Sequence, residues 1–268
     1  MVQILKHWQS PPRACSYLSA EHASIEYRLM LGVTPEEMDR LLERGWRRFG
    51  PAYFRPACSA CAHCVSLRID VEGFAPSRTQ KRIWKHAQRF RVRAGRPTVD
   101  SARLDLYQRW HAARAVSRGW DADVIQAEEY FHQFAFPHPC VRELSLYDVV
   151  PSEAAPGPEA ERLIAVAVMD ETPSALSAIY TFHDPEYARF SVGTAMILLQ
   201  RSLALSARKR WLYLGYRVLG CPSSEYKKNF RPHELLMGRP DMSEMPDWRA
   251  ASVCFDKEPS EMAHLRVG

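Results

Sequence analysis

Three regularly spaced cysteines are the residues of this sequence most suited to chemistry. Cys58, Cys61 and Cys64 form a Cys-x2-Cys-x2-Cys run. A tetrahedral zinc ion or an iron–sulfur cluster needs a fourth ligand. His63 is one candidate for this fourth ligand, and Cys140 is a weaker one. The other interpretation is that these thiols are reduced and packed in a turn, because the sequence has no second cysteine pair of the zinc-ribbon type.

A run of positive charge follows the cysteines. Residues 1–100 contain 17 Lys and Arg against 9 Asp and Glu, although the whole chain has a net charge of only +5. From Arg78 to Arg96 there are eight basic residues and no acid. Their helical spacing places several on one face, which suits binding to phosphates, although many such runs are only solvated helix faces. The residues of this face are Arg78, Arg82, Lys85 and Arg89.

Two glycine-containing segments and a Tyr-Lys pair are further candidates for binding and catalysis. The segment Ser191–Thr194 closes an expected strand and opens an expected helix, where free backbone N–H groups attract anions. A simple strand-to-helix turn is the equal alternative. Gly215 lies within an expected strand and permits close approach of a substrate to the backbone. Tyr226 and Lys227 belong to a second basic segment that is unusual for pure packing.

The elements that must position these residues follow from hydrophobic periodicity. Thr34 and Glu37 flank a proline at the start of a helix, which is a capping-box signature. Ser77 is the expected N-cap of the basic helix. The other expected elements are a strand at 65–72, helices at 101–118 and 126–135, a polar loop at 151–161, strands at 163–169, 175–182 and 188–192, a helix at 193–210 and a strand at 211–218.

The chain therefore divides into an N-terminal region, 1–100, with the cysteines and the basic helix, a second unit, 101–240, and a tail, 241–268. Seven cysteines, an odd number, are typical of free thiols or metal ligands in a cytosol. The N-terminus lacks a signal-peptide pattern, and no apolar run is long enough to cross a bilayer. We expect a cytoplasmic protein that binds neither membrane nor DNA.

Two blocks of sequence resemble the aminoacyl-tRNA–protein transferases, which mark protein N-termini for degradation. The first runs from Gly45-Trp-Arg-Arg-Phe-Gly50 and Tyr53-Phe-Arg-Pro56 through the cysteine run to Arg82. The second joins Leu212-Tyr-Leu-Gly-Tyr216 to Glu225-Tyr-Lys-Lys-Asn-Phe-Arg-Pro-His-Glu-Leu235. The blocks occur in the family's order, and the resemblance covers most of residues 15–236.

The resemblance implies a fold, a fourth cysteine ligand and a set of site residues. The fold is GNAT-like, an acetyltransferase-like mixed sheet of the α+β or α/β class with flanking helices, preceded by a cysteine-containing N-terminal region. Cys15 is the expected fourth ligand of a zinc or iron–sulfur site, although transfer itself requires no cofactor. The implied catalytic residues are Tyr226 and Lys227. The implied substrate-binding residues are Arg68, Ser77, Arg78, Gln80, Ser191, Gly193, Thr194 and Gly215, and the implied tRNA-binding residues are Lys81, Arg82, Lys85 and Arg89.

The resemblance also implies the reaction. An aminoacyl-tRNA is already an activated ester, so no covalent nucleophile is needed, and no G-x-S-x-G pattern occurs in the sequence. The short chain and intact cysteine run resemble the bacterial branch that transfers leucine from leucyl-tRNA to proteins beginning with Asp or Glu, with arginine as the alternative donor. A coenzyme-A-dependent acetyltransferase and a non-catalytic RNA-binding protein with a cysteine knuckle are the alternatives of other classes.

Overall fold

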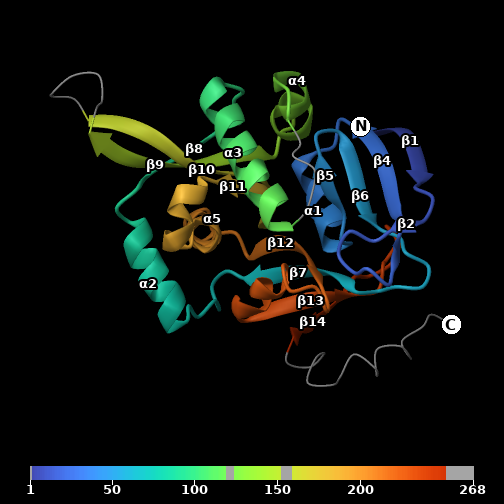
Figure 1. Cartoon of the computed structure of the whole chain (residues 1–268). Coiled ribbons are helices and arrows are strands. Elements are labelled where there is room, and N and C mark those ends of the chain that lie inside the picture. The colour runs from blue at the N-terminus through green and yellow to red at the C-terminus, as the bar shows by residue number, and fades with distance from the viewer. Residues whose placement is uncertain (1, 119–123, 152–158, 252–268) are drawn as a thin grey trace.

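A mixed eight-stranded sheet forms the centre of the computed structural model, which describes residues 2–118, 124–151 and 159–251 (Figure 1). The strand order is β14-β13-β7-β12-β11-β10-β9-β8. Among these strands only β11 and β12 pair in parallel, and every other neighbouring pair is antiparallel. The strands are β7 (Cys64–Asp70), β8 (Arg91–Gly95), β9 (Val141–Pro151), β10 (Glu159–Glu171), β11 (Ala175–His183), β12 (Trp211–Val218), β13 (His233–Met237) and β14 (Asp247–Ala250).

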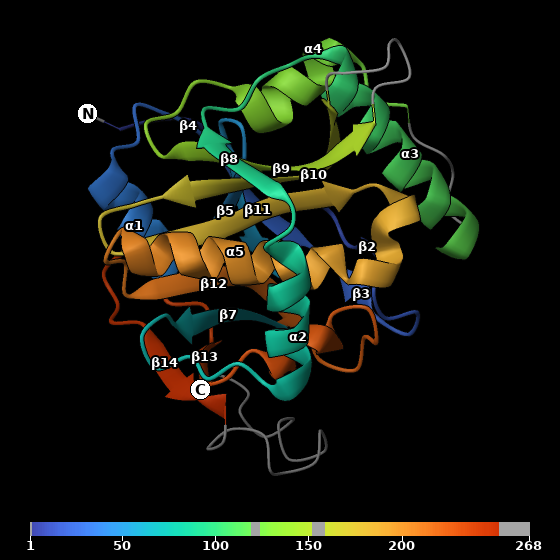
Figure 2. The ribbon, with the colours of Figure 1, turned by 90° about the vertical axis from the view of Figure 1, so that its left-hand side faces the viewer.

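Both faces of this sheet are covered, so its central strands are apolar on both sides. Along β10, Ala167 and Met169 pack in one core, whereas Val166 and Val168 pack in another. The first core is closed by helix α5 (Val192–Ser206), beside which lies α2 (Arg78–Ala87) (Figure 2). The second core is closed by α3 (Ser101–Arg118), α4 (Ala127–Tyr130) and the π-helical turn η1 (Phe131–Ala135).

A four-stranded antiparallel sheet from the N-terminal region packs beside the large sheet. Its order is β1-β4-β6-β5, and Trp46 and Tyr53 are fully buried in the core that it shares with Trp211 and Tyr213 of β12. The capping box of Thr34 and Glu37 forms as predicted and starts the helix of this layer. The elements are β1 (Gln3–Gln9), β4 (Ile25–Leu31), α1 (Pro35–Glu43), β5 (Arg47–Phe49) and β6 (Ala52–Pro56), with a small hairpin of β2 (Arg13–Ala14) and β3 (His22–Ala23).

Two of the sequence-based element predictions are wrong. Residues 188–192 are not a strand, because Asp184 caps a 3-10 helix, η2 (Pro185–Phe190), by accepting a hydrogen bond from the Glu186 N–H. The helix predicted to end at 210 already ends at Ser206, and Arg208 has a left-handed φ of 54°. Most of the polar loop predicted at 151–161 lies outside the described residues, as does the tail beyond residue 251.

The large sheet takes strands from both sides of residue 100. Strands β7 and β8 come from the N-terminal region, and β9 to β13 come from the second unit. Strand β14 lies in the segment predicted as a tail. Within the described residues, none of the helices is both long and apolar enough to cross a membrane.

Candidate active site

The candidate site lies where β11 and β12 part. Their parallel pairing is limited to three residue pairs, from Ala175 opposite Trp211 to Ser177 opposite Tyr213. Beyond this point, the pairing of β12 with β7 on its other side is irregular between Tyr213 and Tyr216. Gly215, in that irregularity, has a φ of +73°, which is strained for any residue with a Cβ. The strand therefore needs glycine here, at the predicted substrate-binding position.

Lys227 reaches this glycine from a 3-10 turn, η3 (Glu225–Asn229). A Cβ on Gly215 would lie 3.8 Å from Lys227 Nζ, which donates a 2.5 Å hydrogen bond to the Tyr216 carbonyl. Glu225 holds the turn against β12 through an ion pair with Arg217 at 3.1 Å. The second sequence block thus folds so that its Lys lies against its Gly.

The Lys227 ammonium is in an unfavourable place for a charge. Burial lowers the pKa of Lys227 to about 8, and the nearby Arg47 guanidinium adds to this, with Cys64 opposing it. A lysine with this pKa is neutral in about a tenth of molecules at pH 7 and in about half at pH 8. Lys227 can therefore act as a base near neutral pH, as well as donate hydrogen bonds.

Tyr226 points to a second part of the site, and its side chain is 46% exposed. Partial burial raises the pKa of its phenol, and the Arg114 guanidinium opposes this rise. Burial lowers the pKa of His183, with Arg114 adding to the effect, so Arg114 is close to both residues. His183 Nε2 would lie 4.0 Å from a Cβ on Gly193. His183 therefore lies at the start of α5, and the Arg114 charge acts on both His183 and Tyr226.

The start of α5 has free N–H groups of the kind that attract anions. Ser191 adopts a left-handed conformation with φ 54°, and its side chain makes no capping hydrogen bond. Gly193 and Thr194 follow in the first turn and are half-buried. The sequence predicted this turn, but it gave no signal for Arg114 or His183, which come from other elements.

Arg47 is a third functional candidate, after Arg114 and His183, that the sequence did not single out. It is 6% exposed and lies over the rings of Tyr213 and Tyr216, at 5.2 and 5.6 Å from their centres. Its Nη1 donates to the Trp46 carbonyl, its Nη2 donates to the Ser66 hydroxyl, and its Nε has no partner. Burial lowers the pKa of Arg47. The only available signal was the Arg47-Arg48 pair in the first sequence block.

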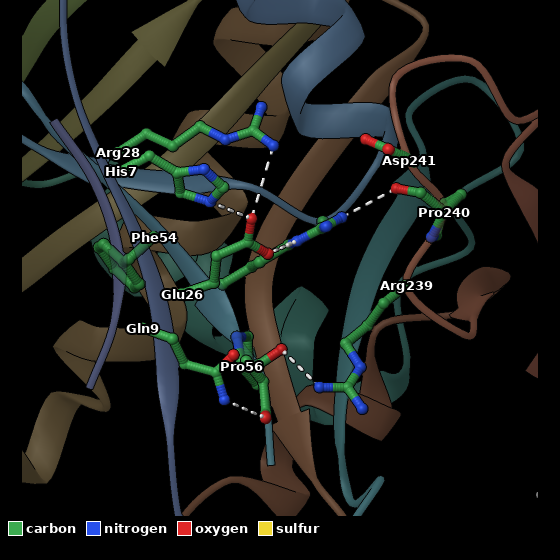
Figure 3. Close-up of polar contacts among 12 residues, drawn as sticks. His7, Gln9, Glu26, Arg28, Phe54, Pro56, Arg239, Pro240 and Asp241 are labelled. Carbon is green, nitrogen blue, oxygen red and sulfur yellow. Dashed lines mark hydrogen bonds and ion pairs between the residues drawn. The ribbon is translucent and has the colours of Figure 1, made fainter. Parts of the chain in front are cut away.

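A network in the four-stranded sheet holds the strand of Arg47 in place (Figure 3). Glu26 accepts hydrogen bonds from His7 at 2.8 Å and from Arg55 at 2.6 Å, and Arg55 also donates to the Pro240 carbonyl at 2.8 Å. Burial opposes ionisation of Glu26, but the hydrogen bonds from Arg55 and His7 hold its pKa below the ordinary value. The Arg55 guanidinium packs over the ring of Trp46, the residue before Arg47.

Arg68, predicted to bind substrate, has partners of its own. Its Nε and Nη2 lie 2.8 and 2.7 Å from Glu234 of β13, and its guanidinium stacks on Trp211 at 3.8 Å and on Trp248 at 4.2 Å. The charge of Arg68 is therefore matched within the protein. This arrangement connects β7, β12, β13 and β14.

Ser77 and Gln80, also predicted to bind substrate, form a capping box at the start of α2. Ser77 Oγ accepts from the Gln80 N–H at 3.2 Å, and Gln80 Oε1 accepts from the Ser77 N–H at 2.8 Å. Gln80 Nε2 also donates to the Asn229 carbonyl at 3.1 Å. This last bond joins the basic helix to the turn that carries Tyr226 and Lys227.

The basic face of α2 is exposed. Arg89, which follows the helix, lies 3.5 Å from Asp148, whereas the Arg and Lys residues within the helix form no ion pair with a carboxylate of the described chain. These residues are Arg78, Lys81, Arg82 and Lys85. Unmatched positive charge on one helix face is suited to a polyanion.

Cys64 is the first residue of β7, and Cys58 and Cys61 precede it in the chain. Burial raises the pKa of Cys64 to about 12, and the thiols of Cys58, Cys61, Cys15 and Cys221 add to this, so the five lie near one another. Within residues 2–118, 124–151 and 159–251, however, no three His, Cys, Asp or Glu side chains are arranged as ligands of one metal ion. The described arrangement thus does not fit a metal site.

Several contacts of these thiols and their neighbours are to the backbone, and Cys221 Sγ lies 3.2 Å from the Ser223 hydroxyl. Cys58 Sγ accepts from the Ser24 N–H at 3.4 Å, and Cys15 Sγ accepts from the Tyr17 N–H at 3.5 Å. His63 Nδ1 lies 3.2 Å from the Leu219 carbonyl, and Cys140 is buried in the core around Trp46. Cys221 was not predicted as a member of this group.

Comparison with known proteins gives matches along most of the chain. Residues 13–82 match the family described as arginine-tRNA-protein transferase, N terminus, and residues 102–237 match arginine-tRNA-protein transferase, C terminus. An aspartate/glutamate leucyltransferase of Helicobacter hepaticus is 31% identical over 91% of this chain and 97% of its own length. One from Pseudomonas savastanoi pv. phaseolicola is 36% identical over 87% of this chain and 94% of its own.

Solved structures give weaker matches. L-PGS from Bacillus licheniformis has a TM-score of 0.45 and 11% identity, over 80% of this chain and 63% of that one. FemX has a TM-score of 0.42 and 10% identity, over 66% of this chain and 59% of that one.

Proposed function

Because the chain belongs to the arginine-tRNA-protein transferase family, we propose that it transfers leucine from leucyl-tRNA to the N-terminal α-amine of proteins that begin with Asp or Glu. The product is a protein with a destabilising N-terminus, which directs it to degradation by the N-end rule. The observation that carries the proposal is the match to aspartate/glutamate leucyltransferases over 97% and 94% of their lengths. The charged tRNA and the acceptor protein are then the two partners.

The donor binds, in this proposal, along α2 and at the start of α5. The exposed cations of α2 contact tRNA phosphates, since they have no carboxylate partners in the described chain. The N–H groups of Gly193 and Thr194 in the first turn of α5 face the 3′ end that carries the amino acid, whereas the Ser191 N–H already donates to the Ala188 carbonyl at 2.9 Å. The crossover from β11 through α5 to the parallel strand β12, and the short pairing of these strands, support a GNAT-like assignment of the sheet.

The reaction needs alignment and one proton transfer. The acceptor α-amine attacks the ester carbonyl carbon, a new C–N bond forms, and the C–O bond to the ribose breaks. The nitrogen loses a proton and the ribose oxygen gains one. Lys227, with its pKa of about 8, is suited to accept the first proton and return it to the leaving oxygen. Proximity provides most of the remaining acceleration.

We assign Tyr226 to stabilising the oxyanion that forms when the α-amine attacks the ester carbonyl. Tyr226 is more exposed than Lys227, and the Arg114 charge that acts on its phenol favours an anionic group. Gly215 keeps the backbone beside Lys227 Nζ free of a side chain, since a Cβ there would contact that nitrogen at 3.8 Å.

The proposal is tested with radiolabelled donors. Leucyl-tRNA, arginyl-tRNA and acetyl coenzyme A are each offered to the full chain with peptides that differ only in their first residue: Asp, Glu, Asn or Gln. We expect label from leucyl-tRNA on the Asp and Glu peptides alone. Transfer from arginyl-tRNA alone would assign the donor named in the family descriptions, and acetyl transfer without aminoacyl transfer would refute the proposal.

A further inference from the structure

Arg47 differs from the other buried arginines of the described chain in having no acidic partner. Four arginines are less than one-tenth exposed: Arg47, Arg48, Arg55 and Arg103. Arg48 pairs with Asp170, Arg55 with Glu26 and Arg103 with Glu143. Arg47 instead contacts a carbonyl, a hydroxyl and two aromatic rings. A buried charge is unfavourable unless an opposite charge compensates it. We therefore expect the group that compensates the Arg47 charge to belong to a bound molecule.

The Nε edge of the buried Arg47 guanidinium has the geometry that a carboxylate requires. A carboxylate binds best to Nε and one Nη through two parallel hydrogen bonds. Arg47 Nε has no partner, and Nη2 donates to the Ser66 hydroxyl, a neutral group that can rotate away. The Asp170 carboxylate acts on Arg47 from a distance and raises its pKa, but both oxygens of this carboxylate are bound by Arg48.

The place of Arg47 in the site suits the chemistry of an acidic N-terminal residue. In such a residue the α-amine and the carboxylate are joined through only Cα and one or two side-chain carbons. A group that binds the carboxylate must therefore lie close to the group that handles the α-amine. Arg47 is close enough to Lys227 for its charge to act on it, and both contact the segment Tyr213–Tyr216 of β12.

We propose that Arg47 binds the side-chain carboxylate of the acceptor's first residue and so selects acidic N-termini. The assignment rests on the proposed function, because it concerns the acceptor of that reaction. Arg68 does not serve this role, since Glu234 already matches its charge. Arg78 is exposed on α2 and belongs to the tRNA-binding face. Recognition of the carboxylate is thus placed in β5, and recognition of phosphates in α2.

The test compares Asp-led and Asn-led peptides, which have nearly the same shape and differ in charge. The full chain and its Arg47→Met variant are assayed for kcat/KM with both peptides. Loss of a charge-assisted hydrogen bond should lower the value for the Asp peptide by about 10- to 100-fold and change the value for the Asn peptide much less. Arg47→Lys keeps the positive charge but cannot donate two parallel hydrogen bonds to one carboxylate. It should therefore recover only part of the preference for the Asp peptide that Arg47→Met loses.

Stability separates this role from a structural one. Because Arg47 has no acidic partner, Arg47→Met should leave the denaturation midpoint unchanged or raise it. The adjacent Arg48→Met is the matched control, and it should lower the midpoint because Asp170 loses its partner. A fall in the midpoint of Arg47→Met as large as that of Arg48→Met would assign Arg47 to structure and overturn the proposal.

Arg78→Met provides the second control. It should weaken tRNA binding and leave the ratio of Asp to Asn rates unchanged. If Arg78→Met abolished the preference and Arg47→Met kept it, the inference would be wrong. Direct titration of the two peptides into the protein without tRNA separates failure of the inference from failure of the proposed function. Equal binding of both peptides to the unmodified chain would refute the inference, whereas preferential binding of the Asp peptide, lost in Arg47→Met, would support it even if no transfer occurred.

Discussion

At the scale of single residues, the proposed proton transfer depends on the protonation of Lys227. Its pKa of about 8 is close to the 7.7–8.0 expected for an acceptor α-amine. Both groups must lose a proton before attack. The kcat/KM of the unmodified chain should therefore rise with pH as both groups titrate, and the rise should be steepest below pH about 8. In Lys227→Arg the side chain stays protonated, so kcat should fall by about 10²–10⁴ and only the amine titration should remain.

The pH profile also separates the two candidate catalytic residues. If Lys227→Arg kept the steep, two-proton profile, Lys227 would not be the base. If Tyr226→Phe removed one titration instead, the roles that we assign to Tyr226 and Lys227 would have to be exchanged. Steady-state rates with an Asp-led peptide, measured from pH about 6 to about 9, distinguish these outcomes.

Arg48, unlike Arg47, has a structural role, because it forms a buried ion pair with Asp170. Their side chains are 2% and 1% exposed, and Arg48 Nε lies 3.0 Å from Asp170 Oδ2. Removing one partner leaves a buried charge, so Arg48→Met should lower the free energy of unfolding by about 3–5 kcal/mol. Adding Asp170→Asn to this variant should recover part of the loss. Urea denaturation measures both, and an additive further loss in the double variant would contradict the pairing.

At the scale of elements, α2 is assigned to the tRNA. Lys85→Ala should weaken binding of charged tRNA and lower the slope of log affinity against log salt by about 0.7–0.9, because one phosphate contact is lost. Arg91→Ala is the matched control, since Arg91 is exposed but lies 3.0 Å from Glu161. Filter binding across a salt series is the measurement. Equal slopes for Lys85→Ala and the unmodified chain would remove Lys85 from the interface.

The elements that were predicted correctly are those with a local signal. Each of these signals lies within the element that it predicts. They are the capping boxes at Thr34 and Ser77 and the apolar run at 211–218, and α1, α2 and β12 begin where they predict. Strand β1 was not predicted, because all seven of its residues are exposed and it has no buried face to produce an alternating pattern. Residues 188–192 read as a strand because they are short and apolar, yet the Asp184 cap favours a 3-10 helix.

The site was predictable only in part, for a related reason. Tyr226, Lys227 and Gly215 lie in one sequence block, and the resemblance to a family brought them to notice. Arg47 is important because it is buried without an acid, and burial of this kind depends on residues from β7 and β12 that are distant in sequence. A sequence shows that a residue is an arginine, but the lack of a partner is visible only in three dimensions.

At the scale of the whole molecule, the Glu26 network couples the N-terminal sheet to the segment that begins at Arg239. Glu26 binds Arg55, Arg55 binds the Pro240 carbonyl, and Arg239 binds the Cys58 carbonyl at 3.0 Å. Because the folded pKa of Glu26 is lowered, its contribution to stability is present above the unfolded pKa, near 4.5, and is lost as the pH falls through the folded value.

Glu26→Gln should therefore destabilise the protein by about 1–3 kcal/mol at pH 7, with a smaller difference from the unmodified chain below pH about 4.5. Denaturation at the two pH values provides the measurement. A difference that stays constant or grows toward low pH would contradict the assigned ionisation. His7 loses a partner in the same variant, but at an exposed position.

The central claim is that leucine from leucyl-tRNA becomes joined to the α-amine of an acidic N-terminal residue. The most direct measurement is mass spectrometry of an Asp-led peptide that also contains an internal lysine, after incubation with leucyl-tRNA and the purified chain. We predict a single added leucine, located by fragmentation on the N-terminal Asp, and no addition to the Asn-led counterpart or to a peptide with an acetylated N-terminus. Leucine on the lysine side chain, equal addition to the Asn-led peptide, or no addition from any charged tRNA would contradict the account.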